Sequence, residues 1–249
     1  MRAILTYHSI DPSGSAISVA PEEFRRHVAW LASGRVRVVP LEQLLALPAE
    51  AGAVALTFDD AFANFGEVAA PLLQEHGLPA TLFVVSDHVG GSNRWGGKAD
   101  MWVPELPLLD WPALGRLAEQ GFTLGGHTRR HPHLTACTDA QLLDELAGGA
   151  ERMVKELGRR PVEFAYPYGD VNPAVARAVG RVFQRAVTTE LRVLGPADDP
   201  LWLPRLDMFY LRRAGALEAY GSARFAGTLW MRAQARRVRA ALGTFGGQW

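Results

Sequence analysis

Two groups of polar residues in this chain have the types and the spacing of a hydrolytic metal site. Asp59 and Asp60 end the apolar run at 53–58, and His127 and His131 follow a second apolar run far along the chain. One carboxylate and two imidazoles can hold a divalent cation and leave positions open for water and substrate. The other carboxylate can lie beside that water as a general base. Such a set of groups hydrolyses amides or esters.

Each group also has an ordinary structural explanation. Adjacent aspartates after a strand can cap the next helix, where carboxylates favour the helix dipole. Two histidines in a loop that contains Pro132 can be plain surface residues. However, imidazoles four residues apart can face one ion, and Gly125 and Gly126 before them allow backbone segments to approach closely. The aspartate pair and the histidine pair together indicate metal binding more strongly than these structural explanations.

The bulk composition excludes several other classes of protein. With 249 residues, of which 48% are hydrophobic, the chain can form one large domain. Its 26 basic and 26 acidic residues cancel, so no overall positive field attracts nucleic acid. Cys137 is the only cysteine, which excludes an internal disulfide and a cysteine-based zinc site. We identify no signal peptide and no membrane span, and therefore expect a cytoplasmic protein.

Short apolar runs alternate with amphipathic segments along the chain. Strands are expected at 3–7, 35–39, 53–58, 80–85, 123–126, 162–165, 185–188 and 203–206. Helices are expected at 21–33, 41–47, 65–76, 111–120, 139–157 and 173–179. This alternation predicts an α/β fold with a parallel sheet. The number of units favours a closed or nearly closed barrel over two domains.

The candidate groups all lie where such a barrel concentrates its chemistry. Asp59, Asp60, His127, His8 and Tyr168 stand at or just past the ends of predicted strands. Active sites of (β/α) barrels are built at the carboxyl ends of the strands. The agreement between the pattern of elements and the position of the polar residues supports both predictions.

The motifs resemble those of the polysaccharide deacetylase family, carbohydrate esterase family four. The first family motif, Thr-Phe-Asp-Asp, stands unaltered at 57–60, and the second, His-Ser/Thr-x-x-His, stands at 127–131. The segment Phe-Ala-Tyr-Pro-Tyr-Gly at 164–169 resembles the third motif. The likeness runs from about residue 3 to residue 210. It implies a distorted (β/α) barrel of about seven strands that removes N-acetyl groups from an amino-sugar glycan.

The resemblance also implies roles for individual residues. Asp59 would be the catalytic base, and Asp60, His127 and His131 would hold one divalent metal ion. The backbone N–H of Tyr168 would face the developing oxyanion. The ligand set favours Zn²⁺, with Co²⁺ or Ni²⁺ as alternatives. The expected partner is an N-acetylated amino-sugar substrate, and no nucleic acid is expected.

Two departures from the family pattern concern the arginine that orients the base and the residue that donates the proton. The third motif usually carries an arginine that orients the base, and this chain has Ala165 there. Arg205, at the last predicted strand, is expected to supply the guanidinium instead, although an arginine at a barrel mouth is more often a surface ion pair. The Leu-x-His motif of the general acid is absent, and no histidine follows His133. His8 is therefore the expected acid, with His133 as second choice.

Two regions lie outside the barrel pattern. The Gly-rich loop at 88–107 is long enough to be functional. Trp95, Trp102 and Asp100 in this loop, and Pro167 in the third motif, are expected to contact the substrate, although a tryptophan can equally pin a loop to the barrel. The chain divides into a barrel at 1–212 and an Arg- and Trp-rich helical tail at 213–249. The tail is expected to pack on the barrel or to contact the inner membrane peripherally.

Two other functions stay open at this stage. The same scaffold could cleave another C–N or ester bond in a small metabolite, as the allantoinase-like relatives of this family do. Alternatively, the missing acid motif could mark a sugar-binding module without catalysis, although the intact Asp59 argues against it. Acetate release from N-acetylated oligosaccharides would separate these functions.

Overall fold

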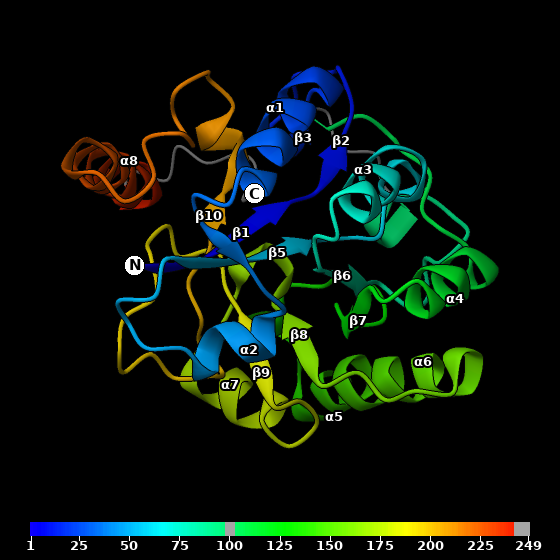
Figure 1. The fold of residues 1–249 in the computed structure, drawn as a ribbon. Coiled ribbons are helices and arrows are strands. Elements are labelled where there is room, and N and C mark those ends of the chain that lie inside the picture. Colours follow the sequence, from blue (N-terminus) through cyan, green and yellow to red (C-terminus); the bar gives the residue numbers. More distant parts are fainter. Residues whose placement is uncertain (98–102, 242–249) are drawn as a thin grey trace.

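A curved sheet of parallel strands lies at the centre of the computed structural model, which describes residues 1–97 and 103–241 (Figure 1). Its strands are β1 (Arg2–Tyr7), β4 (Arg37–Val38), β5 (Ala53–Phe58), β6 (Ala80–Val84), β7 (Thr123–Gly126), β8 (Glu163–Ala165), β9 (Arg185–Val187) and β10 (Leu206–Asp207). They lie in the order β10-β1-β5-β6-β7-β8-β9, and β4 pairs with the start of β5. A separate pair, β2 (Ser9–Ile10) and β3 (Ser18–Val19), follows β1.

The two edges of this sheet nearly meet, so that the sheet closes into a barrel. On one edge, Val187 of β9 forms a parallel bridge with Leu203. On the other edge, β10 pairs with β1 through Leu206 and Leu5. The short segment from Leu203 to β10 therefore connects both edges.

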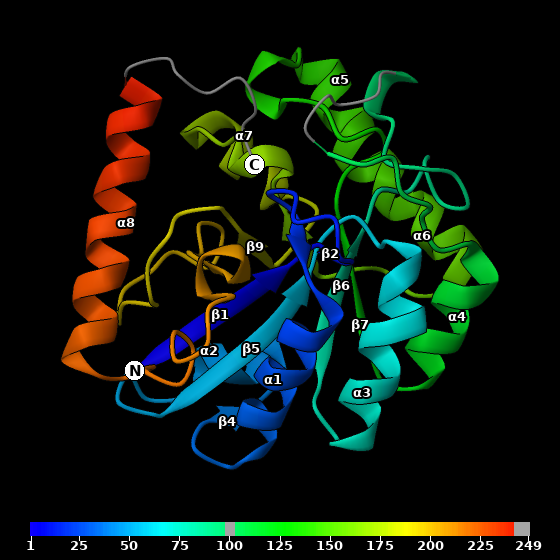
Figure 2. The same cartoon turned by 90° about the horizontal axis from the view of Figure 1, so that it is seen from above.

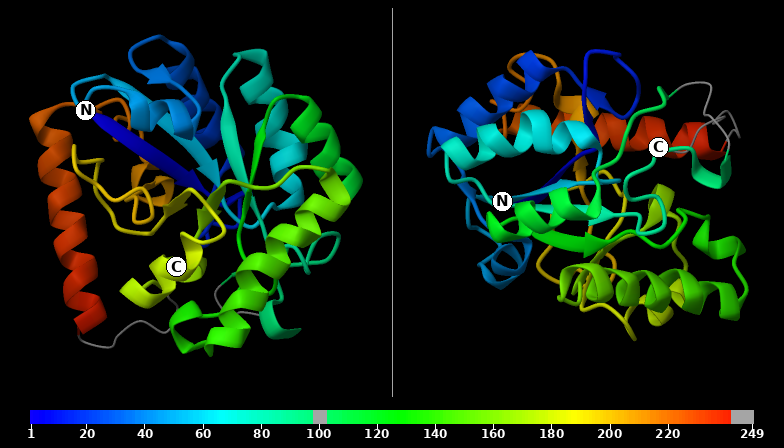
Figure 3. Two further views of the ribbon diagram at one scale, coloured as in Figure 1. Left: turned by 90° about the horizontal axis from the view of Figure 1, so that it is seen from below. Right: turned by 90° about the vertical axis from the view of Figure 1, so that its right-hand side faces the viewer.

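Helices surround the sheet (Figures 2 and 3). They are α1 (Pro21–Ala32), α2 (Leu41–Ala46), α3 (Ala70–Glu75), α4 (Trp111–Glu119), α5 (Asp139–Leu143), α6 (Gly149–Leu157), α7 (Pro173–Val179) and α8 (Ala223–Ala241). Helix α2 differs from the others because Leu41 and Leu44 join the buried cluster inside the barrel. It closes the end where the strands begin, and the opposite end stays available for a site.

Side chains from alternate positions of the strands fill the barrel. Ile4, Ala55, Phe83, Ala165 and Val187 come from five different strands and form one buried cluster. They can meet only if they all point toward the barrel axis. Hydrophobic residues on the opposite faces of the strands pack against the helices outside.

The same alternation directs polar residues into the carboxyl end of the barrel. Thr57 and Asp59 continue the inward row of β5, and His127 stands two residues after Gly125 in the inward row of β7. The absent side chain of Gly125 leaves room for Phe83, because a Cβ there would lie 2.5 Å from the Phe83 ring. The close approach expected at this glycine therefore occurs.

The barrel expected from the sequence is confirmed, and the differences lie at the ends of elements. The last strand, expected at 203–206, has its ladder at Leu206–Asp207 and only a single bridge at Leu203, because the chain passes there from one edge to the other. The strand expected at 35–39 is limited to Arg37–Val38. Strands β2 and β3 were not anticipated, since two residues show no alternation. Helix α8 begins ten residues after the expected start of the tail at 213, and turns fill the interval.

Candidate active site

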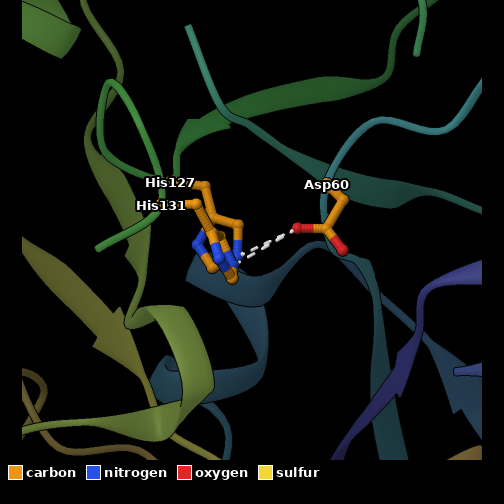
Figure 4. Close-up of side chains that lie close together, drawn as sticks. All are labelled: Asp60, His127 and His131. Carbon is orange, nitrogen blue, oxygen red and sulfur yellow. Dashed lines mark ion pairs between the residues drawn. The ribbon is translucent and has the colours of Figure 1, made fainter. Parts of the chain in front are cut away.

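Asp60, His127 and His131 converge on one point at the carboxyl end of the barrel (Figure 4). Asp60 follows β5, and both histidines follow β7. The Nε2 atoms of His127 and His131 lie 3.4 and 3.5 Å from the same oxygen, Oδ1 of Asp60. All three side chains are buried. Ligands that surround a zinc ion tetrahedrally at about 2.1 Å stand roughly this far apart, so the three atoms fit one cation.

The hydrogen bonds of these groups favour a positive charge between them. Nδ1 of His127 donates to the carbonyl oxygen of Ala165 at 2.7 Å, which leaves Nε2 of a neutral ring as an acceptor facing Asp60. Among the described residues, Oδ1 of Asp60 and Nδ1 of His131 are buried without a hydrogen-bond partner. A buried carboxylate oxygen without a partner is unfavourable. A divalent cation bound to Asp60 and both imidazoles would satisfy this oxygen.

Burial and charge have opposite effects on the pKa values of the three groups. Burial lowers the pKa of His131 to about 3, so its ring is neutral, the form that binds metals. Burial also lowers the pKa of His127, but the nearby carboxylates of Asp60 and Asp59 raise it above its ordinary value. Burial raises the pKa of Asp60, yet the two histidines hold it below its usual range. The site therefore favours a cation, whether a proton or a metal ion.

The second carboxylate, Asp59, is held by Arg205 in a two-pronged ion pair. Nη1 and Nη2 of Arg205 donate to Oδ1 and Oδ2 of Asp59, each at 2.7 Å, and both residues are buried. Nε of Arg205 donates to the carbonyl oxygen of Thr188 at 2.9 Å, and Nη1 also donates to the hydroxyl of Thr6 at 2.9 Å. Burial raises the pKa of Asp59, but the charge and hydrogen bonds of Arg205 hold it well below its usual range. Asp59 is therefore ionised and fixed in orientation.

His8 lies on the open side of this ion pair. Its Nε2 is 3.7 Å from Oδ2 of Asp59, and its side chain is 16% exposed, against 4% for Asp59. A cavity of about 20 Å³ lies between His8, the two aspartates and the three residues Tyr166, Tyr168 and Thr189. This volume holds roughly one water molecule. The structure thus places His8 beside Asp59, at the edge of this cavity.

The backbone is strained at the same place. Five non-glycine residues in the described part of the chain have positive φ, and they are Asp60, Ala61, Thr128, His131 and Tyr168. Each such residue costs on the order of 1 kcal/mol and persists only where its surroundings fix it. At Asp60, the left-handed backbone (φ 70°) turns the side chain out of the alternating pattern of β5 and toward the histidines.

Glu145 fixes the loop that carries the histidines, and sequence reasoning missed it. This residue lies in the π turn Asp144–Gly148 between α5 and α6 and is buried. Its Oε2 accepts the backbone N–H groups of Arg129 and Arg130 at 2.9 and 3.0 Å, and its Oε1 accepts Nη1 of Arg130 at 2.6 Å. In the sequence, an acidic residue on an amphipathic helix indicates only a solvated face. The acidic residue's position opposite the loop appears only in three dimensions.

Aromatic rings form a wall beside the histidines. The ring of Trp95 stacks on His131 at 4.6 Å, and Tyr168 meets His131 edge-on at 4.5 Å. His133, the second choice for the acid, stacks on Tyr168 at 4.2 Å, and its Nδ1 is 3.8 Å from Asp170. Trp95 therefore packs against a candidate metal ligand. This contact is consistent with a tryptophan that holds its loop on the barrel, and it also places Trp95 next to the candidate site.

The remaining candidates are placed only in part. Pro167 is buried at the start of the helical turn Pro167–Gly169, next to Tyr168. Asp100 and Trp102 lie outside the described residues.

Comparison with known proteins gives one family. The model of the family described as polysaccharide deacetylase matches residues 47–185, more than half of the chain. A Bacillus subtilis protein, YxkH, assigned to the polysaccharide deacetylases, is 28% identical over 194 residues. That alignment covers 75% of this chain and 64% of the relative, so the chain spans under two thirds of the relative's length.

Two further comparisons agree with this result. The poly-β-1,6-N-acetyl-D-glucosamine N-deacetylase of Staphylococcus epidermidis is 23% identical over 203 residues, with 76% of this chain and 67% of the relative covered. The structure of IcaB from Ammonifex degensii superposes with a TM-score of 0.71 at 23% identity and covers 82% of this chain and 90% of that chain. At this identity the structural likeness shows the fold alone.

Proposed function

The chain belongs to the polysaccharide deacetylase family, and on this premise we propose that it removes N-acetyl groups from an amino-sugar-containing glycan or glycoconjugate and releases acetate. The observation that carries the proposal is that two neighbouring carboxylates have different partners. Asp60 faces two imidazoles, whereas Asp59 is ionised and locked by Arg205 beside them. Hydrolysis of an amide needs both a site that polarises the carbonyl and a base at the attacking water.

Asp60, His127 and His131 would hold one divalent cation, Zn²⁺ in the first place and Co²⁺ or Ni²⁺ as alternatives. When bound, such an ion supplies Lewis-acid polarisation of the acetyl carbonyl and lowers the pKa of water. The carbonyl of Ala165 sets the tautomer of His127, which presents Nε2 to the ion. Burial keeps His131 neutral for the same purpose.

Asp59 would accept the proton of the attacking water. Its bidentate contact with Arg205 keeps the carboxylate in one orientation and favours its ionised form, although a low pKa weakens it as a base. The backbone N–H of Tyr168 would donate to the tetrahedral oxyanion, an interaction typically worth about 3 kcal/mol. His8 would return a proton to the departing amine, since its ring borders the cavity on the side of Asp59.

The sugar itself would lie across the aromatic wall. Trp95 stands next to His131, and Pro167 precedes Tyr168, so both can contact a sugar ring whose acetamide reaches the cavity. Asp100 and Trp102 belong to the same loop as Trp95 and stay proposed substrate contacts. The name of the Staphylococcus epidermidis relative points to β-1,6-linked N-acetylglucosamine oligomers as the first substrate to test.

Acetate release from these oligomers tests the proposal together with metal analysis of two variants. Asp59→Asn should bind metal like the unmodified chain and lose about 10²–10⁴ in turnover, because only the base is removed. His127→Ala should lose metal and turnover together. Full activity of Asp59→Asn would refute the assignment of the base. Metal binding without hydrolysis of any N-acetylated oligomer would instead indicate a sugar-binding module.

A further inference from the structure

Helix α8 exposes a row of large apolar side chains. Within the described residues, only four large hydrophobic side chains are strongly exposed, and three of them, Trp230, Met231 and Val238, lie on α8. Their exposed fractions are 65%, 59% and 57%. Soluble proteins rarely concentrate exposed apolar surface in this way unless it meets a partner.

The spacing places these residues on one side of the helix, away from the barrel. Trp230 and Met231 are consecutive, Val238 follows Met231 by about two turns, and Gly227 precedes Met231 by about one turn. The opposite side holds α8 on the body of the molecule through buried Phe225 and partly buried Leu229. Helix α8 runs along the margin of the molecule when it is seen from above and from below (Figure 2 and the left panel of Figure 3).

Helix α8 carries only positive charge, whereas the total charge of the chain is balanced. The helix carries five arginines and no acidic residue, and these arginines are Arg224, Arg232, Arg236, Arg237 and Arg239. Arg232 and Arg236 lie over the ring of Tyr210 at 5.6 and 5.8 Å from its centroid, and Nη1 of Arg232 is buried without a hydrogen-bond partner among the described residues. Arg224 is exposed at the start of the helix. An anionic partner would complement this charge.

We propose that α8 lies in the interface of an anionic lipid bilayer, with Trp230, Met231 and Val238 inserted among the lipids and the exposed side chain of Arg224 near phosphate groups. An interfacial helix combines an exposed apolar side with flanking basic residues, and a tryptophan prefers the headgroup region. Each arginine near an anionic surface adds attraction. No described helix is long and apolar enough to cross a bilayer, so the contact is peripheral.

Two other partners fit this surface less well. A second copy of the chain, packed through the same side of α8, would bring two basic helices together without an acidic residue on either helix. A nucleic acid would match the arginines, but its phosphate backbone offers no apolar surface to Trp230, Met231 and Val238. Only a surface that is both anionic and apolar matches all of these side chains.

Helix α8 contacts a residue that lines the cavity of the candidate active site. Nη1 of Arg236 donates to the carbonyl oxygen of Thr189 at 3.1 Å, and Thr189 lines the cavity next to Asp59. Binding through α8 would therefore bring the cavity close to the lipid surface. The lipid contact itself does not depend on the proposed deacetylase activity.

Flotation of the whole chain with lipid vesicles tests the proposal. The protein should float with vesicles of phosphatidylcholine and phosphatidylglycerol, much less with phosphatidylcholine alone, and less again at high salt. The double variant Trp230→Ser/Met231→Ser should lower the fraction bound about tenfold at limiting lipid. Leu143→Ser is the matched control, because Leu143 is equally exposed (63%) but lies on α5. It should float like the unmodified chain.

Three results would overturn the proposal. The first is an unmodified chain that does not float with anionic vesicles. The second is a double variant that floats as well as the Leu143→Ser control. The third is a dimer in solution that the double variant converts to a monomer while flotation is absent, which would assign the surface to a second copy. Acetate release, measured in parallel on a soluble oligomer, separates failure of this proposal from failure of the catalytic one.

Discussion

The contact between Asp59 and Arg205 joins residues that are 146 positions apart. The resemblance to the family implies an orienting arginine in the third motif, where this chain has Ala165 in the interior cluster. Here the guanidinium comes from the segment that closes the barrel and lies 6.0 Å from the centroid of the Phe83 ring. The structure places the Arg205 guanidinium against Asp59, and the roles of both residues in turnover stay proposals.

Arg205→Met should destabilise the fold by about 3–5 kcal/mol, because it leaves the Asp59 carboxylate buried without its partner. Urea unfolding followed by circular dichroism measures this change. The double variant Arg205→Met/Asp59→Asn should recover part of the loss, since the unpaired charge is gone. An Arg205→Met variant as stable as the unmodified chain would mean that the carboxylate finds another partner or water.

Glu163 offers a pH-dependent test in the barrel interior, away from the candidate site. Its carboxylate is buried and accepts the hydroxyl of Thr81 at 2.9 Å, while Nη1 of Arg185 stays 3.9 Å away. Burial raises the pKa of Glu163, and these two partners offset burial only in part. The folded state therefore holds its proton more tightly than the unfolded chain does. Glu163 consequently contributes stability below its unfolded pKa, and this contribution is lost as the pH rises through the folded pKa.

Glu163→Gln should accordingly raise the melting temperature at pH 8 and change it little at pH 4. The amide keeps an acceptor for Thr81 and removes the buried charge. Thermal unfolding at the two pH values measures the difference. Glu42→Gln is the control, since Glu42 pairs with the same Arg185 at 3.2 Å but is 71% exposed. A larger benefit at pH 4 than at pH 8 would contradict the direction of the pKa shift.

The loop after β7 owes its shape to the helix that packs against it. Gly149 begins α6 so close to the loop that a Cβ would stand 3.3 Å from the carbonyl carbon of Thr128. This approach lets Glu145 reach the N–H groups of Arg129 and Arg130. A π turn at this point adds a residue to the helix and re-aims side chains, which is common near functional sites.

Glu145→Ala should lower the affinity for Zn²⁺ about 10–100-fold, because the loop that orients His127 and His131 loses its acceptor while the ligands remain. Competition with a fluorescent zinc chelator measures the affinity. Asp144→Ala is the matched control, since Asp144 pairs with the guanidinium groups of Arg129 and Arg130 but accepts no backbone N–H of the loop. Equal losses in both variants would show that guanidinium pairing, and not the backbone contact, fixes the loop.

The sequence predicts the elements whose pattern is long enough to repeat. β1, β5 and β6 are apolar runs of five or six residues, and the structure contains all three. Once these strands are known, the alternation of side chains along them predicts which residues point into the barrel. Glu145 could not be found in this way, because its partners belong to another element and its helix looks like any solvated helix. The two-residue strands β2 and β10 are too short to show an alternation, and the exact position of β10 depends on its contact with β1 near the start of the chain.

The candidate site was predictable for a reason that concerns the molecule as a whole. In a barrel of parallel strands every carboxyl end meets at one mouth, so residues that follow β1, β5 and β7 must be neighbours. His8, Asp59, Asp60, His127 and His131 therefore line one cavity although they span much of the chain. What the topology alone leaves open is the exact aim of each side chain, which depends on the left-handed turns at Asp60 and His131.

Because the three candidate ligands follow two different strands, a metal ion bound to them should stabilise the entire barrel and not only one loop. A ligand that binds only the folded state adds about 2.7 kcal/mol at a hundredfold excess over its dissociation constant. For a domain of this size that corresponds to an increase of roughly 5–10 °C in melting temperature. Stripping the metal with a chelator should lower the melting temperature by this amount, and Zn²⁺ should restore it. Asp59→Asn should keep the shift, because Asp59 is not a ligand, and His131→Ala should lose it. An equal shift in all three proteins would mean that the ion binds somewhere other than Asp60, His127 and His131.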